Sequence, residues 1–321
     1  MVPVMHRRFL ATLAMSWTLA VPAWAQSSPG VAPPGGAIGG ERPTYTERAL
    51  TSTPMDGAIR QRHWAPGLNQ GYVPQGLTFV RGTLFVGTYR STEAQTNRGP
   101  ARIFAVDPNS GAVIGGFDLP AAIGHADGLA ATPDGGLLFL ADNSRTLHAF
   151  DLPRSLQAGT AIAVGDPRPL EKDPALGSNF LAFDGRLLWF GRYSRDDSAA
   201  RLIAADPAVL FGGSSNNNAR PFRAAEAVRS LPLPFHAQGA TFDAAGALWI
   251  STSNGRMGKL HRIDTRTGAV LAQHDAMAGL EDLARGSDGL LWAVGEAGSQ
   301  RWNSWSTFFP LLFSFDPARL K

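Results

Sequence analysis

Five polar side chains recur along this sequence at similar intervals, each near the start of a short apolar run. Successive members lie 52, 52, 59 and 43 positions apart, and they are Gln75, Asp127, Asn179, Gln238 and Glu281. All five carry oxygen atoms of the kind that bind Ca²⁺ or another hard divalent cation. The set therefore predicts a divalent-ion site or, as the plainer alternative, a plug of polar groups that hydrogen-bond to one another.

Within this set, we expect the metal ligands to be Asp127, Asn179, Gln238 and Glu281. Two histidines, His125 in "HADG" and His236 in "HAQG", occupy equivalent positions in two of the repeats. They could face a ligand, or they could hydrogen-bond the loops between blades. A bound ion would polarise a carbonyl group and activate water, and one side chain would act as the general base. The catalytic candidates are Asp127, Glu281, His125 and His236.

The elements that would position these residues repeat with them. Each polar residue is followed by a short strand, a turn and a second strand that carries an aromatic ring 10 to 12 positions later, namely Phe85, Phe139, Trp189, Trp249 or Trp292. A third strand then ends in an aspartate, at Asp107, Asp151, Asp206, Asp264 and Asp316. Units of about 50 residues with this content are typical of β-propellers. Five units predict an all-β, five-bladed propeller, closed by residues 57–65 as the outer strand of the last blade.

Propeller geometry sorts the candidate residues between the two faces. The first strand of each blade lines the central channel, so we expect the five polar residues to ring its top. The second strands return to that face and end at Tyr89, Asn143, Tyr193, Ser253 and Glu296. Further ligand-binding candidates are Arg90, Arg192 and, from the connection 295–312, Arg301 and Trp302. The terminal aspartates belong to turns on the opposite face, and the aromatic series is expected to pack between blades.

The N-terminal residues carry a targeting signal. A basic segment with Arg7 and Arg8, an apolar run over 9–21 and a small-x-small site at 23–25 predict a signal peptide over 1–25. An uncleaved anchor is the alternative. Residues 26–40 have the Pro, Gly and Ser content of a linker, and residues 41–321 form one propeller domain. We therefore expect a periplasmic or secreted protein with no membrane association after cleavage.

Composition limits the classes of partner and of catalytic site that we expect for this protein. Removal of Arg7 and Arg8 lowers the formal charge from +3 to +1, which does not indicate a nucleic-acid partner. The chain has no cysteine, so disulfides, thiol nucleophiles and thiolate metal sites are excluded. The sequence also lacks the serine-elbow, zincin and phosphate-loop motifs. We therefore expect a monomer that binds a small-molecule, glycan or protein ligand.

Several short motifs carry a family resemblance. The segments "YVPQG" (72–76), "GHADGLA" (124–130), "LLWFGRY" (187–193), "QGATF" (238–242) and "LEDLARGSDGLLWAVGEAGS" (280–299) resemble secreted bacterial five-bladed propellers. More distantly, the chain is similar to the gluconolactonase and senescence-marker-protein superfamily. That resemblance implies a divalent ion on the channel-lining strands and hydrolysis of lactones or esters. We therefore predict an extracytoplasmic propeller that binds a ligand at the top of its channel, with a metal-dependent lactonase or esterase as the alternative.

Overall fold

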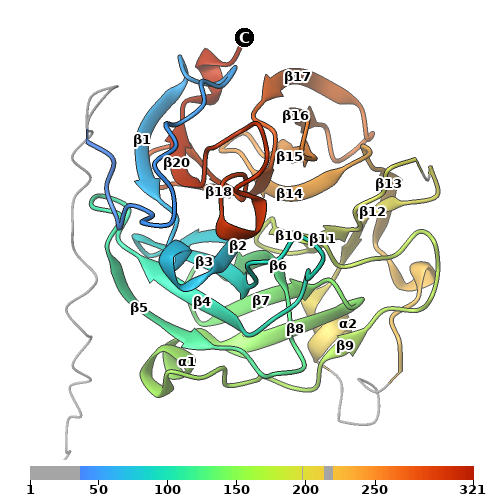
Figure 1. Cartoon of the computed structure of the whole chain (residues 1–321). Coiled ribbons are helices and arrows are strands. Elements are labelled where there is room, and N and C mark those ends of the chain that lie inside the picture. The colour runs from blue at the N-terminus through green and yellow to red at the C-terminus, as the bar shows by residue number, and fades with distance from the viewer. Residues whose placement is uncertain (1–36, 197, 213–219) are drawn as a thin grey trace, which may run out of the picture.

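The structure is a computed structural model that describes residues 37–196, 198–212 and 220–321. Five antiparallel sheets of four strands each stand around a central axis as the blades of a propeller (Figure 1). This arrangement confirms the predicted five-bladed fold. The predicted signal peptide, residues 1–25, and residues 26–36 of the predicted linker lie outside the described residues. No helix in the described ranges is long and apolar enough to cross a membrane.

The blades follow one another along the chain. Blade one contains β2 (Tyr72–Val80), β3 (Thr83–Arg90), β4 (Ala101–Val106) and β5 (Val113–Asp118). Blade two contains β6 (Ala126–Ala131), β7 (Leu137–Asp142), β8 (Thr146–Asp151) and β9 (Arg168–Pro169). Blade three contains β10 (Phe180–Phe183), β11 (Leu188–Gly191), β12 (Arg201–Ala205) and β13 (Arg229–Pro232). Blade four contains β14 (Ala237–Phe242), β15 (Leu248–Ser253), β16 (Gly258–Ile263) and β17 (Val270–Ala276).

Blade five joins the two ends of the described chain. It contains β18 (Leu280–Arg285), β19 (Leu291–Gly295), β20 (Leu311–Phe315) and, as its outer strand, β1 (Ile59–Trp64). β1 pairs antiparallel with β20, and Arg60 forms an ion pair with Asp316 at 2.9 Å. The predicted closure by residues 57–65 is therefore confirmed. Within the predicted linker, Gly39 forms a β-bridge with His63.

The helices are short and lie in the connections. They are α1 (Leu152–Ala158), α2 (Pro207–Phe211) and four 3₁₀ turns at Leu68–Gln70, Ala224–Glu226, Gln300–Trp302 and Pro317–Arg319. Asp151 and Asp206 cap α1 and α2 through their side chains. The other terminal aspartates accept backbone N–H groups two residues later, as Asp107 does from Asn109 at 3.0 Å. Their predicted structural role is confirmed.

The predicted aromatic series forms part of the core between blades. All five rings are buried, with exposed fractions of 1% to 3%, at Phe85, Phe139, Trp189, Trp249 and Trp292. The Nε1 groups of Trp189 and Trp249 donate to Asp184 and Asp243, so each ring is also held by a carboxylate in the preceding turn. These contacts support packing rather than ligand stacking for this series.

Asp282 closes the channel between its two mouths. Its carboxylate is fully buried and accepts backbone N–H groups from Leu77 at 2.8 Å and Leu129 at 3.2 Å through one oxygen. The other oxygen accepts from Ala240 at 3.1 Å and Leu283 at 2.9 Å. Burial raises the pKa of Asp282, and the four N–H donors oppose that rise. One side chain thus ties together the first strands of four blades.

Candidate functional site

A cavity of about 350 Å³ lies at the top of the channel, and we call it the acidic chamber. Four of the five predicted ring residues line it, namely Gln75, Asp127, Asn179 and Gln238. The fifth, Glu281, accepts a hydrogen bond from Gln238 Nε2 at 3.0 Å. Four second-strand ends also line the chamber, namely Tyr89, Asn143, Tyr193 and Glu296. Residues from all five blades therefore meet at one mouth of the channel.

Two buried carboxyl groups form the acidic part of this chamber. Glu281 and Glu296 are 4% and 8% exposed and hydrogen-bond to each other. Burial raises the pKa of Glu296 to about 7. Burial, with the charges of Glu296 and Asp127, raises the pKa of Glu281 well above its usual range. Because two adjacent buried carboxylates repel each other, the pair favours the state in which one of the two groups is protonated.

Neighbouring donors orient Glu296. Its Oε2 atom accepts from Gln75 Nε2 at 3.0 Å and from Trp302 Nε1 at 2.6 Å. Trp302 comes from the 3₁₀ turn Gln300–Trp302, which begins shortly after β19 ends. A carboxyl group that is fixed in this way and titrates near neutral pH suits general acid–base chemistry.

The second-blade residues form a smaller network on the chamber wall. His125 Nδ1 lies against Asp127 Oδ1, and the histidine ring packs on Tyr89 with centroids 4.0 Å apart. Asn179 Nδ2 donates to Asp127 Oδ2 and to Asn143 Oδ1, each at 3.0 Å. His125 therefore faces the chamber as the partner of Asp127.

Arg301 places a buried positive charge in the same chamber. Its side chain is 8% exposed and stacks over Trp302, with the guanidinium carbon 4.2 Å from the ring centre. It donates to the hydroxyl of Tyr89 and to the carbonyl of Ala94, whereas its Nε atom has no hydrogen-bond partner among the described residues. Burial lowers the pKa of Arg301 to about 10, so the group remains charged at neutral pH. It can therefore bind a carbonyl oxygen or an anion that enters the chamber.

The arrangement does not fit the predicted divalent ion. Asn179 and Gln238 turn their NH₂ groups, not their oxygens, toward the carboxylates of Asp127 and Glu281. No group of three His, Cys, Asp or Glu residues within the described ranges could hold a metal ion. The contacts resemble the alternative of a hydrogen-bonded polar network.

Besides Glu281, four predicted residues lie outside the chamber lining. The side chain of Arg90 is exposed, because alternation along β3 turns its neighbour Tyr89 inward instead. Arg192 Nε donates to the Pro174 carbonyl at 2.7 Å. Ser253 is fully buried and donates to the Leu280 carbonyl at 2.7 Å. His236 lines a neighbouring cavity and contacts Tyr193 at 2.7 Å.

Sequence reasoning missed two residues of this region. Asn97 lines the chamber from the connection between β3 and β4, where no periodic pattern marks it. Asp282 closes the channel below it. A usable signal existed for Asp282, because three other blades have a glycine directly after the ring residue, at Gly76, Gly128 and Gly239. A Cβ at Gly239 would lie 2.3 Å from Asp282 Cα, so the glycine gives Asp282 its space.

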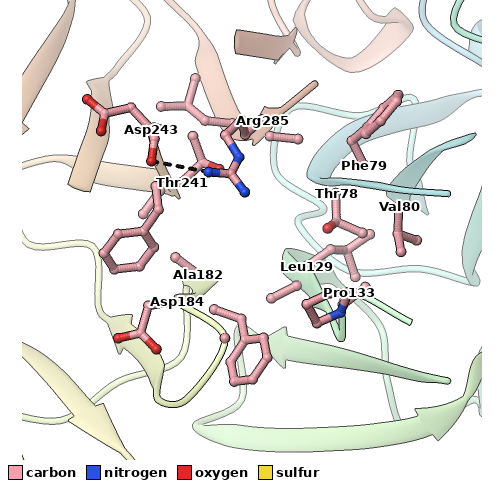
Figure 2. A pocket seen from close by; sticks show the side chains of 18 of the residues that line it. Thr78, Phe79, Val80, Leu129, Pro133, Ala182, Asp184, Thr241, Asp243 and Arg285 are labelled. Carbon is pink, nitrogen blue, oxygen red and sulfur yellow. Dashed lines mark hydrogen bonds between the residues drawn. The ribbon is translucent and has the colours of Figure 1, made fainter. Parts of the chain in front are cut away.

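The opposite mouth of the channel has a different character. Figure 2 shows this cavity of about 580 Å³, bordered by Phe79, Asp184, Asp243 and Arg285. Three of its charged groups form hydrogen bonds within the fold. Asp184 and Asp243 accept from buried tryptophans, and Arg285 donates to the Asp243 carbonyl at 3.3 Å. The chamber, which contains the buried Glu281–Glu296 pair and an Arg301 Nε atom with no hydrogen-bond partner among the described residues, is the stronger candidate.

Comparisons with known proteins support the fold. No protein-family model matches the chain, and a search of curated proteins found no match. The chain is similar to a glutaminyl cyclase structure from Myxococcus xanthus, with 16% identity over 80% of this chain and 94% of that chain and a TM-score of 0.52. Two further matches have TM-scores below 0.5. A mitotic checkpoint complex structure has 11% identity over 88% of this chain and 74% of that chain, with a TM-score of 0.41. A hydrazine synthase from Kuenenia stuttgartiensis has 14% identity over 79% of this chain and 59% of that chain, with a TM-score of 0.38. The gluconolactonase resemblance gains no support from these comparisons.

Proposed function

We propose that the acidic chamber binds a small amine-bearing ligand and catalyses an acyl transfer by moving a proton. The observation that carries this proposal is the hydrogen-bonded Glu281–Glu296 pair, in which burial raises the pKa of Glu296 to about 7. The reaction that we propose first is cyclisation of an amino-terminal glutaminyl residue. The fold likeness to a glutaminyl cyclase motivates this choice of substrate and supports the fold alone.

The proposed reaction uses groups that the chamber already holds. The neutral α-amine of the substrate attacks the carbon of its own side-chain amide, so one C–N bond forms. Glu296 as carboxylate accepts a proton from the attacking nitrogen and returns it to the departing amide nitrogen. The original C–N bond of the side-chain amide then breaks, and its nitrogen leaves as ammonia. Arg301 stabilises the negative charge that develops on the amide oxygen.

The other chamber residues would hold the substrate. Gln75 and Trp302 fix the Glu296 carboxyl group, while the Asp127 carboxylate faces an incoming amine. The alternative of a metal-dependent lactonase has less support, because the polar residues do not form a metal cluster. A periplasmic or secreted location remains part of the proposal and rests on the sequence of residues 1–25 alone.

The test is ammonia release from short peptides that begin with glutamine. The chain without residues 1–25 is incubated with each peptide, and cyclised product is measured by mass spectrometry. We expect turnover by the parent and a loss of kcat of about 100-fold or more in Glu296→Gln. Glu47→Gln is the matched control, because the Glu47 side chain is 97% exposed. If no glutaminyl peptide is cyclised between about pH 5 and 9, the proposed reaction is wrong.

A further inference from the structure

A second cavity opens beside the acidic chamber on the same face. Its volume is about 660 Å³, and its lining includes Arg195, His236, Arg256 and Trp305. We call it the basic groove. Tyr193 lines both cavities, and Trp305 stacks on Trp302 of the chamber with ring centres 4.5 Å apart. The two cavities are therefore neighbours with a common wall.

The charge of the groove is opposite to that of the chamber. Arg195 and Arg256 are exposed, and none of the described lining residues is acidic. Arg195 donates to the Tyr193 hydroxyl, which also lies 2.7 Å from His236 Nδ1. The Arg256 guanidinium forms no hydrogen bond or ion pair with any residue that the structure describes. A ligand that spans both cavities would thus meet carboxyl groups at one end and guanidinium groups at the other.

The groove walls are held in place by specific contacts. Arg48 donates to the carbonyl groups of Asn303, Trp305 and Ser306, the last two at 2.8 and 3.0 Å. His236 has a left-handed backbone with φ of 61°, which is unusual for a residue with a side chain, and its N–H donates to the Ser194 carbonyl at 2.7 Å. Such strain persists only where surrounding contacts enforce it. The groove is therefore preformed.

Gly255 packs closely against the indole ring of Trp305 from the blade-four side. A Cβ at this position would lie 3.1 Å from the Trp305 ring, so a larger residue would press on the indole. The side chain of Trp305 is half-buried, which leaves part of the ring free to pack against a ligand.

We propose that the basic groove binds the carboxylate of a short peptide whose amino terminus occupies the acidic chamber. This inference rests on the proposed function and narrows its substrates to short peptides with a free carboxyl end. The guanidinium groups of Arg195 and Arg256 match a carboxylate in charge and hydrogen-bonding geometry. Trp305 packs against the side chain of the residue that carries this carboxylate.

The first experiment measures ligand binding to the basic groove, independently of the reaction proposed for the acidic chamber. Binding of N-acetylphenylalanine, which has no free amine, is compared with binding of its amide by calorimetry. We expect the acid to bind the parent about tenfold more tightly than the amide, as one charge-assisted contact allows. The double variant Arg195→Gln/Arg256→Gln should lose this difference, and Arg186→Gln at the opposite mouth should keep it. Equal binding of acid and amide by the parent would overturn the proposal.

The second experiment joins the two cavities. Glutaminyl dipeptides with a free carboxylate should have a KM about tenfold lower than their amides with the parent, and the double variant should raise the KM of the acid to that of the amide. If both forms are cyclised with the same KM, the groove proposal is wrong and the cyclase proposal stands. If neither form is cyclised but N-acetylphenylalanine still binds through the arginines, the cyclase proposal is wrong and the carboxylate site stands.

Discussion

Replacing Glu296 with glutamine should change how the stability of this protein depends on pH. Burial raises the pKa of Glu296 from its ordinary value of 4.5 to about 7. Between these values the folded chain binds more protons than the unfolded chain. The stability that Glu296 contributes should therefore be fully present below about pH 4.5 and be lost as the pH rises through about 7. This difference in pKa corresponds to about 3 kcal/mol, at 1.36 kcal/mol per pH unit.

Glutamine at this position cannot ionise, and its amide oxygen can accept the bonds from Gln75 and Trp302. Urea denaturation at about pH 5 and pH 8 should show that the parent loses about 3 kcal/mol more than Glu296→Gln over this interval. Glu47→Gln, an exposed control, should follow the parent. If Glu296→Gln and the parent have the same pH dependence, Glu296 does not ionise in this range and the acid–base argument fails.

Three further outcomes follow from the fold and the chamber. Asp282→Asn should lower the free energy of unfolding by about 3 kcal/mol, because an NH₂ group would face two of the backbone donors. Thermal denaturation should show a clear loss of stability for this variant and none for the control Asp288→Asn, which lies at an exposed turn. Deletion of residues 41–66 should destabilise the whole domain through the loss of β1, and protease digestion of the variant would reveal cleavage in other blades as well. Arg301→Met should keep the packing on Trp302 but lower kcat for glutaminyl peptides by about 100-fold; unchanged kcat would remove Arg301 from the proposed reaction.

The fold could be predicted from the sequence because its signal is repeated. A strand, a turn and an aromatic strand recur five times, and each repeat must pack its apolar residues against its neighbours. The last repeat ends after three strands, while residues 57–65 form a strand without a partner. Together these two observations predicted the pairing of β1 with β20, which the structure confirms.

The contacts within the chamber could not be predicted in the same way. Strand alternation sends consecutive residues to opposite faces, so Glu281 and Asp282 should not both reach the channel. The pairing of β18 with β19 shifts register between Leu280 and Leu283, which marks a β-bulge and breaks that alternation. The raised pKa of Glu281 and Glu296 also depends on burial beside the connection around Trp302, and no local pattern encodes that approach.

Four residues of the acidic chamber and the channel below it come from the fifth blade, so the acidic chamber cannot form before this blade is complete. Glu281, Asp282, Glu296 and Arg301 all belong to the blade whose other strands follow those of blades one to four along the chain, whereas its outer strand β1 precedes the other described strands. Until residues 280–315 exist, β1 has no strand to pair with, and the carboxyl groups that would be costly to bury are not yet present. A chain that stops early therefore carries neither a closed ring nor the acidic chamber. Closure of the ring and completion of the acidic chamber therefore depend on the same segment of the chain.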